Sequence, residues 1–356
     1  MEKQSIRIPS LDGLRAISIF FVIYSHAFKP QLINFGKLGV KIFFIISSYL
    51  IVGILLKDIE KNRFSLRNFY FKRAMRIFPA FYIYLVIIFI FMKSINVFSL
   101  EHFWRAPLFI FNYQPNSSWI PAEWFVGHSW SLAVEEQFYV LIALLFLLVK
   151  KQFLNNKKMI YIFLSIIVIV PVIRICYLYF QNIPDFLKNS VNRSFETVAD
   201  SLAVGGIFAI LKDKIEVHRL FMFFKNKILF LFTLILGIMV LNSSLVSEKF
   251  GLKPRYIFNL CGQTIINFSI AIIILFCINL KKSTFIFRFL NHKFMITIGI
   301  WSYSIYLWQQ VWFFTWEIPI IIKVAGTFVC AILSYYLVEL NFLKVRDNYF
   351  LKKNQK

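Results

Sequence analysis

The sequence predicts an all-α membrane protein, a polytopic helical bundle of about ten transmembrane helices with both termini in the cytoplasm. Hydrophobic residues make up 59% of the 356-residue chain and charged residues only 16%, a balance typical of chains that fold in lipid. Long apolar runs recur, separated by charged breaks or by breaks that contain Pro and Asn. Most of the 40 Lys and Arg residues fall at the two ends and in alternate connections, which the positive-inside rule places in the cytoplasm.

Taken in order, the apolar runs give the predicted spans. Their approximate positions are residues 11–28, 38–56, 77–97, 129–149, 158–180, 195–211, 227–245, 259–280, 294–316 and 318–339. The segment 103–113 is a candidate for a further re-entrant or interfacial piece. We expect one membrane domain over residues 1–356, with spans ending near residue 340, a basic cytoplasmic tail at 341–356 and no extra soluble domain.

The positive charge of the chain does not indicate a nucleic-acid partner. The formal net charge is +23, but the basic residues are distributed over the predicted cytoplasmic connections, where orientation and anionic lipid headgroups require them. Membrane lipids are therefore the partner that this charge predicts. Paired spacing is also missing among the cysteines, so we expect neither disulfides nor a metal site. These cysteines are Cys176, Cys261, Cys277 and Cys330.

The first span carries an ionisable residue near each end. Arg15 and His26 are eleven residues apart in the sequence, which places them on one face of a helix and roughly 16 Å apart along its axis. An ionisable side chain inside an apolar span is costly and normally faces protein or a wet cavity, so both are candidate functional residues. The alternative is that Arg15 extends to the membrane surface and that His26 is a hydrogen-bonded core histidine.

A basic segment leads into the third span. Arg73 and Arg76 are three residues apart and lie on one face of a helix at the predicted cytoplasmic edge. Guanidinium groups bind phosphate oxygens bidentately and stay charged. The pair is therefore a candidate site for a phosphorylated cosubstrate, and it would lie near Arg15 if the first and third spans are neighbours.

A polar stripe begins the fourth span. His128, Ser131 and Glu135 follow the spacing i, i+3 and i+7, and Glu136 is about 100° further round the helix. Glu135 would lie about 10 Å in from His128, so it and His26 could meet in one outward-facing cavity. A carboxylate beside an imidazole fixes its tautomer and supports its protonated form, as a general base requires.

Together these segments resemble the acyltransferase-3 family, integral-membrane O-acyltransferases that modify sugars outside the cytoplasm. The resemblance runs nearly from end to end. Its four main motifs are Leu11-Asp12-Gly13-Leu14-Arg15 with His26 after ten residues, residues 39–51, residues 73–79 and residues 128–139. Weaker similarity covers residues 200–205, 298–308 and 334–339.

The resemblance implies a membrane O-acyltransferase of the bacterial inner membrane. It implies that His26 is the catalytic histidine and that Glu135 and Glu136, in the segment that begins with Trp130 and Ser131, complete the catalytic site. It implies that acyl-CoA, most simply acetyl-CoA, is the cosubstrate, that a sugar, polysaccharide or lipid-linked glycan is the acceptor, and that no metal takes part. The donor would be served by Arg15, Arg73 and Arg76. The supporting residues would be Asp12, His128, Trp130, Ser131 and Gln309.

Three positions depart from the family pattern. Gln309 stands where a histidine is usual, Ser48 where a glycine is usual, and Asn341 where a proline is usual. Gln309 can donate and accept hydrogen bonds but cannot titrate. This departure points to an altered acceptor or rate more than to an inactive chain.

The charge pattern also suggests a mechanism. Acyl-CoA would bind from the cytoplasm and a sugar hydroxyl from outside, with His26 taking the hydroxyl proton and a glutamate steadying the imidazolium. Trp308, Trp312 and Trp316 would offer stacking faces for a sugar, or form an interfacial aromatic belt with the tryptophans of the outer loop. The rival functions are a transporter or flippase for a polymer or lipid-linked sugar, and a non-catalytic partner in polysaccharide assembly.

Overall fold

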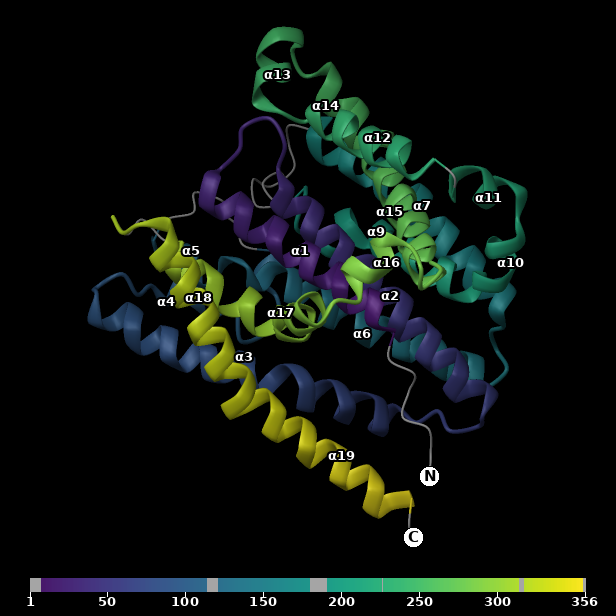
Figure 1. Cartoon of the computed structure of the whole chain (residues 1–356), viewed down its shortest axis with the longest axis horizontal. Helices are drawn as coiled ribbons and strands as arrows, with labels where there is room; N and C mark the ends of the chain where they lie inside the picture. The colour runs from purple at the N-terminus through teal and green to yellow at the C-terminus, as the bar shows by residue number, and fades with distance from the viewer. Residues whose placement is uncertain (1–7, 114–120, 180–190, 226, 314–316, 355–356) are drawn as a thin grey trace. The chain divides into compact units, whose positions relative to one another are not determined.

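The computed structural model of the chain describes residues 8–113, 121–179, 191–225, 227–313 and 317–354. Every regular element in these ranges is helical, which confirms the predicted all-α fold (Figure 1). The helices form two compact units, one of residues 1–56 and 154–302, the other of residues 57–153 and 303–356. The chain changes unit inside α2 (Phe35–Glu60), inside α17 (Lys293–Trp312), and between α6 (Ser129–Lys150) and α7 (Asn156–Tyr179).

The first unit contains most of the helices. Besides α7, most of α2 and the first half of α17, it holds α1 (Pro9–Phe28), α9 (Phe195–Ile210), α10 (Lys212–Val217), α11 (Arg219–Lys225), α12 (Ile228–Val240), α13 (Ser244–Phe250), α14 (Lys253–Ile257), the π-helical turn η2 (Phe258–Gly262), α15 (Gln263–Ile278) and α16 (Phe285–Leu290). α7 packs along α9. Ser48 of α2 donates a hydrogen bond to the Leu202 carbonyl of α9 at 2.5 Å.

Two glycines bring helix backbones into contact around the start of α1. Gly13 lies against the backbone of Leu290 at the end of α16, and Gly299 of α17 lies against the backbone of Asp12. A Cβ atom at either glycine would overlap the facing carbonyl group, so only glycine permits this approach. The turn that carries Asp12 and Arg15 is therefore held from two sides.

The second unit is built on α3 (Leu66–Ser94) and α6. Its other elements are α4 (Leu100–Phe103), the 3-10 turn η1 (Phe111–Tyr113), α5 (Pro121–Gly127), the second half of α17, α18 (Ile320–Ser334), the π-helical turn η3 (Tyr335–Glu339) and α19 (Leu340–Asn354). α19 lies beside α3 (Figure 1), where Phe71 packs on Tyr349 with ring centroids 4.7 Å apart.

The segment 103–113, predicted to be re-entrant or interfacial, contains only the end of α4 and the turn η1. It is fastened to α6 through side-chain amides. Asn112 and Gln137 exchange two hydrogen bonds of 3.0 Å, and Gln137 also donates to the Phe109 carbonyl at 3.0 Å. These bonds satisfy the polar groups of an irregular segment, as burial requires.

Each of the ten predicted spans overlaps a helix in the described residues. Within the described residues, seven helices are long and apolar enough to cross a membrane, or eight if the bent pair α12 and α13 is one span. α9 falls short because its 16 residues cover about 24 Å of a hydrocarbon layer about 30 Å thick. The chain is thus a polytopic helical membrane protein, while the count of ten, the cytoplasmic termini and the single membrane domain stay predictions.

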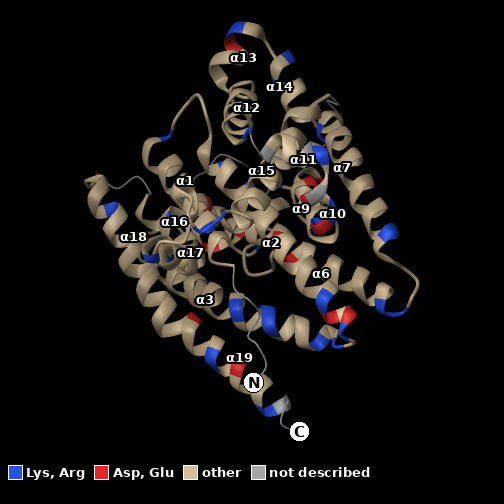
Figure 2. Ribbon diagram, turned by 45° about the vertical axis from the view of Figure 1, so that its right-hand side comes forward, with Lys and Arg blue, Asp and Glu red and all other residues tan. Residues whose placement is uncertain are grey.

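Lys and Arg lie mainly near the ends of the helices (Figure 2). On α7, for example, Lys157 and Lys158 lie in the first turn. Arg174, five residues before the end of α7, differs from these residues because it is fully buried. Its Nη2 lies 2.5 Å from Asp200 Oδ1 on α9, so the two form a buried ion pair inside the first unit.

Candidate functional site

α1 carries the first group of predicted site residues on one uninterrupted helix. Asp12 is buried, and its Oδ1 lies 3.8 Å from Nη1 of Arg15 one turn further on. His26 lies half-buried in the last turn. The helix ends at Phe28, after which Lys29 adopts a left-handed conformation with φ 45°. As predicted, Arg15 and His26 lie on one helix, Arg15 in its second turn and His26 in its last. The pairing of Arg15 with Asp12 was not predicted.

Arg73 and Arg76 lie one turn apart on α3 in the second unit, and both are half-buried. The Arg73 guanidinium lies 5.4 Å from the ring centroid of Tyr139 on α6. The Tyr139 hydroxyl donates to Glu135 Oε2 at 3.4 Å. Glu135 and Glu136 are both among the charged neighbours of Arg73. Two of the predicted donor-binding arginines, Arg73 and Arg76, therefore lie together with the predicted catalytic glutamates, a proximity that the sequence did not predict.

A third carboxyl group belongs to this cluster. Glu339, the last residue of η3, is 5% exposed and accepts a hydrogen bond from Ser304 of α17. Arg76 is one of its charged neighbours. Glu136 Oε1 is buried and has no hydrogen-bond partner among the described residues. We call Arg73, Arg76, Glu135, Glu136 and Glu339 the arginine–glutamate cluster.

His128 precedes α6 and is 2% exposed. Its main-chain N–H donates to Gln310 Oε1 at 2.8 Å, and its Nδ1 lies 2.6 Å from the same atom. Since a main-chain N–H can only donate, this atom is the amide oxygen and Nδ1 carries a proton towards it. A neutral ring then has its lone pair on Nε2. Tyr84 and Tyr306 meet the ring edge-on, with centroids 5.3 and 5.4 Å away.

Ser131 is part of the same aromatic surroundings. Its Oγ lies 2.6 Å from the oxygen of the Tyr306 hydroxyl, and this hydroxyl donates its proton to the His128 carbonyl at 3.1 Å. Trp130 is half-buried. Gln309 of α17, which precedes Gln310 in the sequence, is fully buried. Gln310 was not predicted, because its only signal in the sequence is a second amide next to Gln309.

The predicted site residues are divided between the two units. His26 and Arg15 belong to the first unit, whereas the arginine–glutamate cluster belongs to the second. The predicted meetings of His26 with the glutamates and of Arg15 with the arginine pair stay predictions. Of the tryptophans considered for sugar stacking or a membrane belt, Trp308 packs edge-on against Tyr84 at 5.2 Å, whereas Trp316 and Trp119 lie outside the described residues.

The fold and these groups define the class of the protein, a multi-pass helical membrane protein with charged and hydrogen-bonding side chains buried among its helices. Such side chains are rare in membrane segments and mark functional sites. The chain belongs to the acyltransferase-3 family, because the family model described as an acyltransferase domain matches residues 8–339. The resemblance inferred from the four motifs is therefore confirmed.

Several curated relatives are similar over almost the whole chain. One, from Staphylococcus aureus (strain COL), bears the name "Putative O-acetyltransferase SACOL0978" and is 29% identical over 373 residues, covering 95% of this chain and 57% of the relative. The peptidoglycan O-acetyltransferase OatA of Listeria monocytogenes is 28% identical over 392 residues, covering 98% and 59%. The O-acetyltransferase OatA of Staphylococcus aureus (strain NCTC 8325) is 27% identical over 357 residues, covering 93% and 56%.

The chain thus spans a little over half the length of the curated relatives that it matches. No solved structure matches the chain.

Proposed function

We propose that the chain is a membrane O-acetyltransferase, which moves an acetyl group from cytoplasmic acetyl-CoA to a hydroxyl of a glycan outside the cytoplasm. The observation that carries this proposal is the match to the acyltransferase family over residues 8–339. The names of the relatives support the O-acetyl chemistry. The name of the Listeria relative also makes peptidoglycan the first acceptor to test, before exopolysaccharide, lipopolysaccharide and lipid-linked precursors. The proposal places the protein in a bacterial inner membrane.

In this proposal the donor binds to the arginines. Coenzyme A carries phosphate groups, and Arg15, Arg73 and Arg76 offer guanidinium groups that remain charged at any physiological pH. The ion pair with Asp12 orients Arg15. The glutamates near Arg73 balance its charge, so that a half-buried guanidinium is stable before the donor arrives.

His26 is the general base of the proposed reaction. It accepts the proton of the sugar hydroxyl while that oxygen attacks the thioester carbonyl. The new C–O bond forms, the C–S bond breaks, and the proton passes from the imidazolium to the coenzyme A thiolate. Glu135 or Glu136 steadies the imidazolium. Gln309 contributes hydrogen bonds but no proton, because an amide does not titrate.

The experiment that tests this function follows the acetyl group. Membranes that contain the protein are incubated with acetyl-CoA radiolabelled in the acetyl group, and label is measured in the isolated glycan. We expect label with the wild-type protein and a fall of about 100-fold or more with His26→Ala, because a general base contributes at least that factor. His218→Ala is the matched control, since His218 is exposed and has no role in the proposal.

The outcomes separate the rival functions. Equal labelling by wild type and His26→Ala, at equal protein level, would refute His26 as the base. Absence of label with both proteins, together with impaired export of the polymer, would favour a transporter. Label that appears only when a second membrane protein is present would favour a non-catalytic partner.

A further inference from the structure

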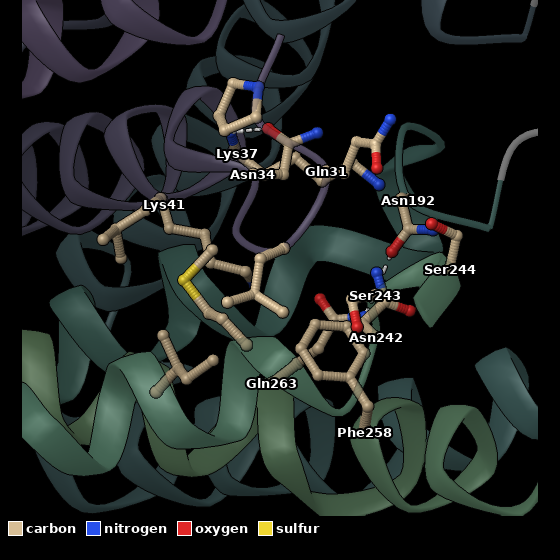
Figure 3. Close-up of a pocket in the computed structure, with 15 residues that line it drawn as sticks. Gln31, Asn34, Lys37, Lys41, Asn192, Asn242, Ser243, Ser244, Phe258 and Gln263 are labelled. Atoms are coloured by element: carbon tan, nitrogen blue, oxygen red, sulfur yellow. Dashed lines mark hydrogen bonds between the residues drawn. The ribbon is translucent and has the colours of Figure 1, made fainter. Parts of the chain in front are cut away.

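The first unit contains a polar pocket that the proposed chemistry does not use. Its volume is about 240 Å³, and it adjoins a wider hollow of about 480 Å³ that shares Lys37, Asn192, Asn242 and Ser244 with it. Figure 3 shows the side chains that line it. They come from the connection after α1, the first turns of α2, the residues before α9, the end of α12, η2 and the start of α15.

Amide and hydroxyl side chains dominate the polar part of the lining. They are Gln31, Asn34, Asn192, Asn242, Ser243, Ser244 and Gln263. Gln263 donates to Asn192 Oδ1 at 3.2 Å and to Asn259 Oδ1 at 2.9 Å, which fixes its position. Phe258 adds an aromatic ring to the wall. Amides and hydroxyls both donate and accept hydrogen bonds, as the hydroxyl groups of a sugar require.

Two lysines make the pocket cationic. Lys37 and Lys41 lie one turn apart at the start of α2, where like charges on one face repel each other. Lys41 Nζ donates to the neutral amide of Asn267 at 3.3 Å. Its acidic neighbour Asp200 is already ion-paired with Arg174 at 2.5 Å. An anion between the two lysines would relieve this repulsion.

Further features of the pocket favour an anion. The N-terminal end of α2 lies at the pocket, where Asn34 accepts a hydrogen bond from the Lys37 N–H at 2.9 Å, and helix N-termini attract negative charge. Among the described residues of the two linings, Glu248 is the single carboxylate, and it lies in the wider hollow with Arg255. The π-helical turn η2 forms part of the wall, and such turns are frequent at functional sites.

The position of the pocket connects it with the proposed reaction. Two of its lining segments, at 30–34 and 192, belong to connections that the predicted topology places outside the cytoplasm. A third, at 242–244, lies at the outer end of the predicted span 227–245. Pro30 follows His26 by four residues, just beyond the end of α1. A ligand in this pocket therefore lies at the end of the helix that carries the proposed base.

We propose that the pocket binds the acceptor glycan through a sugar unit that bears a negative charge, either a carboxylate or a phosphate. Lys37 and Lys41 bind the anion, and the amides around them bind the sugar hydroxyls. This inference rests on the proposed function, because it names the substrate class of the same transfer.

Direct binding tests the inference without relying on transfer. The full chain, in nanodiscs of zwitterionic lipid, is titrated with an oligogalacturonate, a hexose phosphate and a neutral N-acetylglucosamine oligomer. We expect the two acidic ligands to bind more tightly than the neutral one. We expect Lys37→Met and Lys41→Met each to weaken acidic binding about tenfold, the size of a lost charge-assisted hydrogen bond, and to leave neutral binding unchanged. Lys253→Met is the matched control, since Lys253 is exposed and lines neither hollow.

Four results would overturn the inference. The first three are failure of the acidic sugars to bind the wild type, equal affinity of the wild type for neutral and acidic sugars, and unchanged affinity for the acidic sugars in both lysine variants. The fourth is displacement of the acidic sugars by added phosphatidylglycerol, which would assign the pocket to lipid headgroups. If the acidic sugars bind but no acetyl group is transferred, the proposed function is refuted and the pocket remains a binding site for charged glycans. Transfer with normal kinetics in Lys37→Met and Lys41→Met would retain the function and refute the pocket as its acceptor site.

Discussion

Arg174 shows how a single residue can connect three helices in a membrane protein. Its Nε donates to the Thr197 carbonyl at 2.6 Å and its Nη2 to Asp200 Oδ1 at 2.5 Å. Asp200 Oδ2 accepts from Thr264 of α15 at 3.2 Å. The ion pair therefore joins α7, α9 and α15 through hydrogen bonds that leave the aspartate well satisfied.

Removal of one partner of this pair should be costly. We expect Arg174→Met to destabilise the protein by about 3–5 kcal/mol, because it leaves Asp200 charged and buried without its partner. The double variant Arg174→Met with Asp200→Leu should regain much of this loss, since no buried charge remains. Thermal unfolding of the detergent-solubilised chain measures both. A double variant no more stable than Arg174→Met would contradict this account.

Local spacing predicted part of the candidate site. Arg15 and His26 share α1, and Arg73 and Arg76 share a face of α3, because helical periodicity relates residues that are near in sequence. The contacts of Gln310 with His128 and of Ser304 with Glu339 join residues more than thirty positions apart. No periodicity encodes such contacts, so the sequence did not reveal them. The side chains of Lys41 and Arg174 carried a signal that went unused, namely a charge inside an apolar span.

At the scale of the helix, the close contact between two helix backbones decides which residues a position at that contact tolerates. We expect Gly299→Ala to destabilise the protein by about 1–3 kcal/mol, because its Cβ would overlap the Asp12 backbone and force the helices apart. Donor binding should weaken as well, since the shift moves the turn that carries Arg15. Thermal unfolding and acetyl-CoA titration measure the two effects.

Gly53 on α2 supplies the control for this substitution. A Cβ there would meet nothing within 4 Å, so Gly53→Ala should stabilise the helix by about 0.5–1 kcal/mol. A loss of stability of equal size in both variants would show that the contact at Gly299 is not the cause.

Hydropathy predicted the existence of the helices better than the positions where they begin and end. The third span was predicted at 77–97, but α3 begins at Leu66, after Ser65 accepts a hydrogen bond from the Asn68 N–H. The segment after residue 340 was predicted as a basic tail and forms α19, which packs on α3. Both extensions are polar or basic, and therefore invisible to a search for apolar runs, although their residues form helices well.

For the whole molecule, the topology depends on α9. With α7, α9 and α12 all crossing the membrane, positions 157 and 249 lie on opposite sides, and the ten-span prediction places 249 outside. In a background without the four native cysteines, a membrane-impermeant maleimide should label Lys249→Cys in intact cells, and Lys157→Cys only after permeabilisation. Labelling of both from the same side would show that one of the two short helices, α9 or α12, does not cross.

The turn η3 fixes which side chain the end of α18 presents. A π-helical turn holds one residue more than the α-helical turns around it, so deletion of one residue there would return the turn to α-helical winding and change which side chain stands at its end. Glu339 ends this turn and reaches Ser304 from it. A homologue one residue shorter at this point would offer a neighbouring side chain to α17 instead. A change of length by one residue in η3 would then remove that carboxylate from Ser304 without any substitution of Glu339 itself.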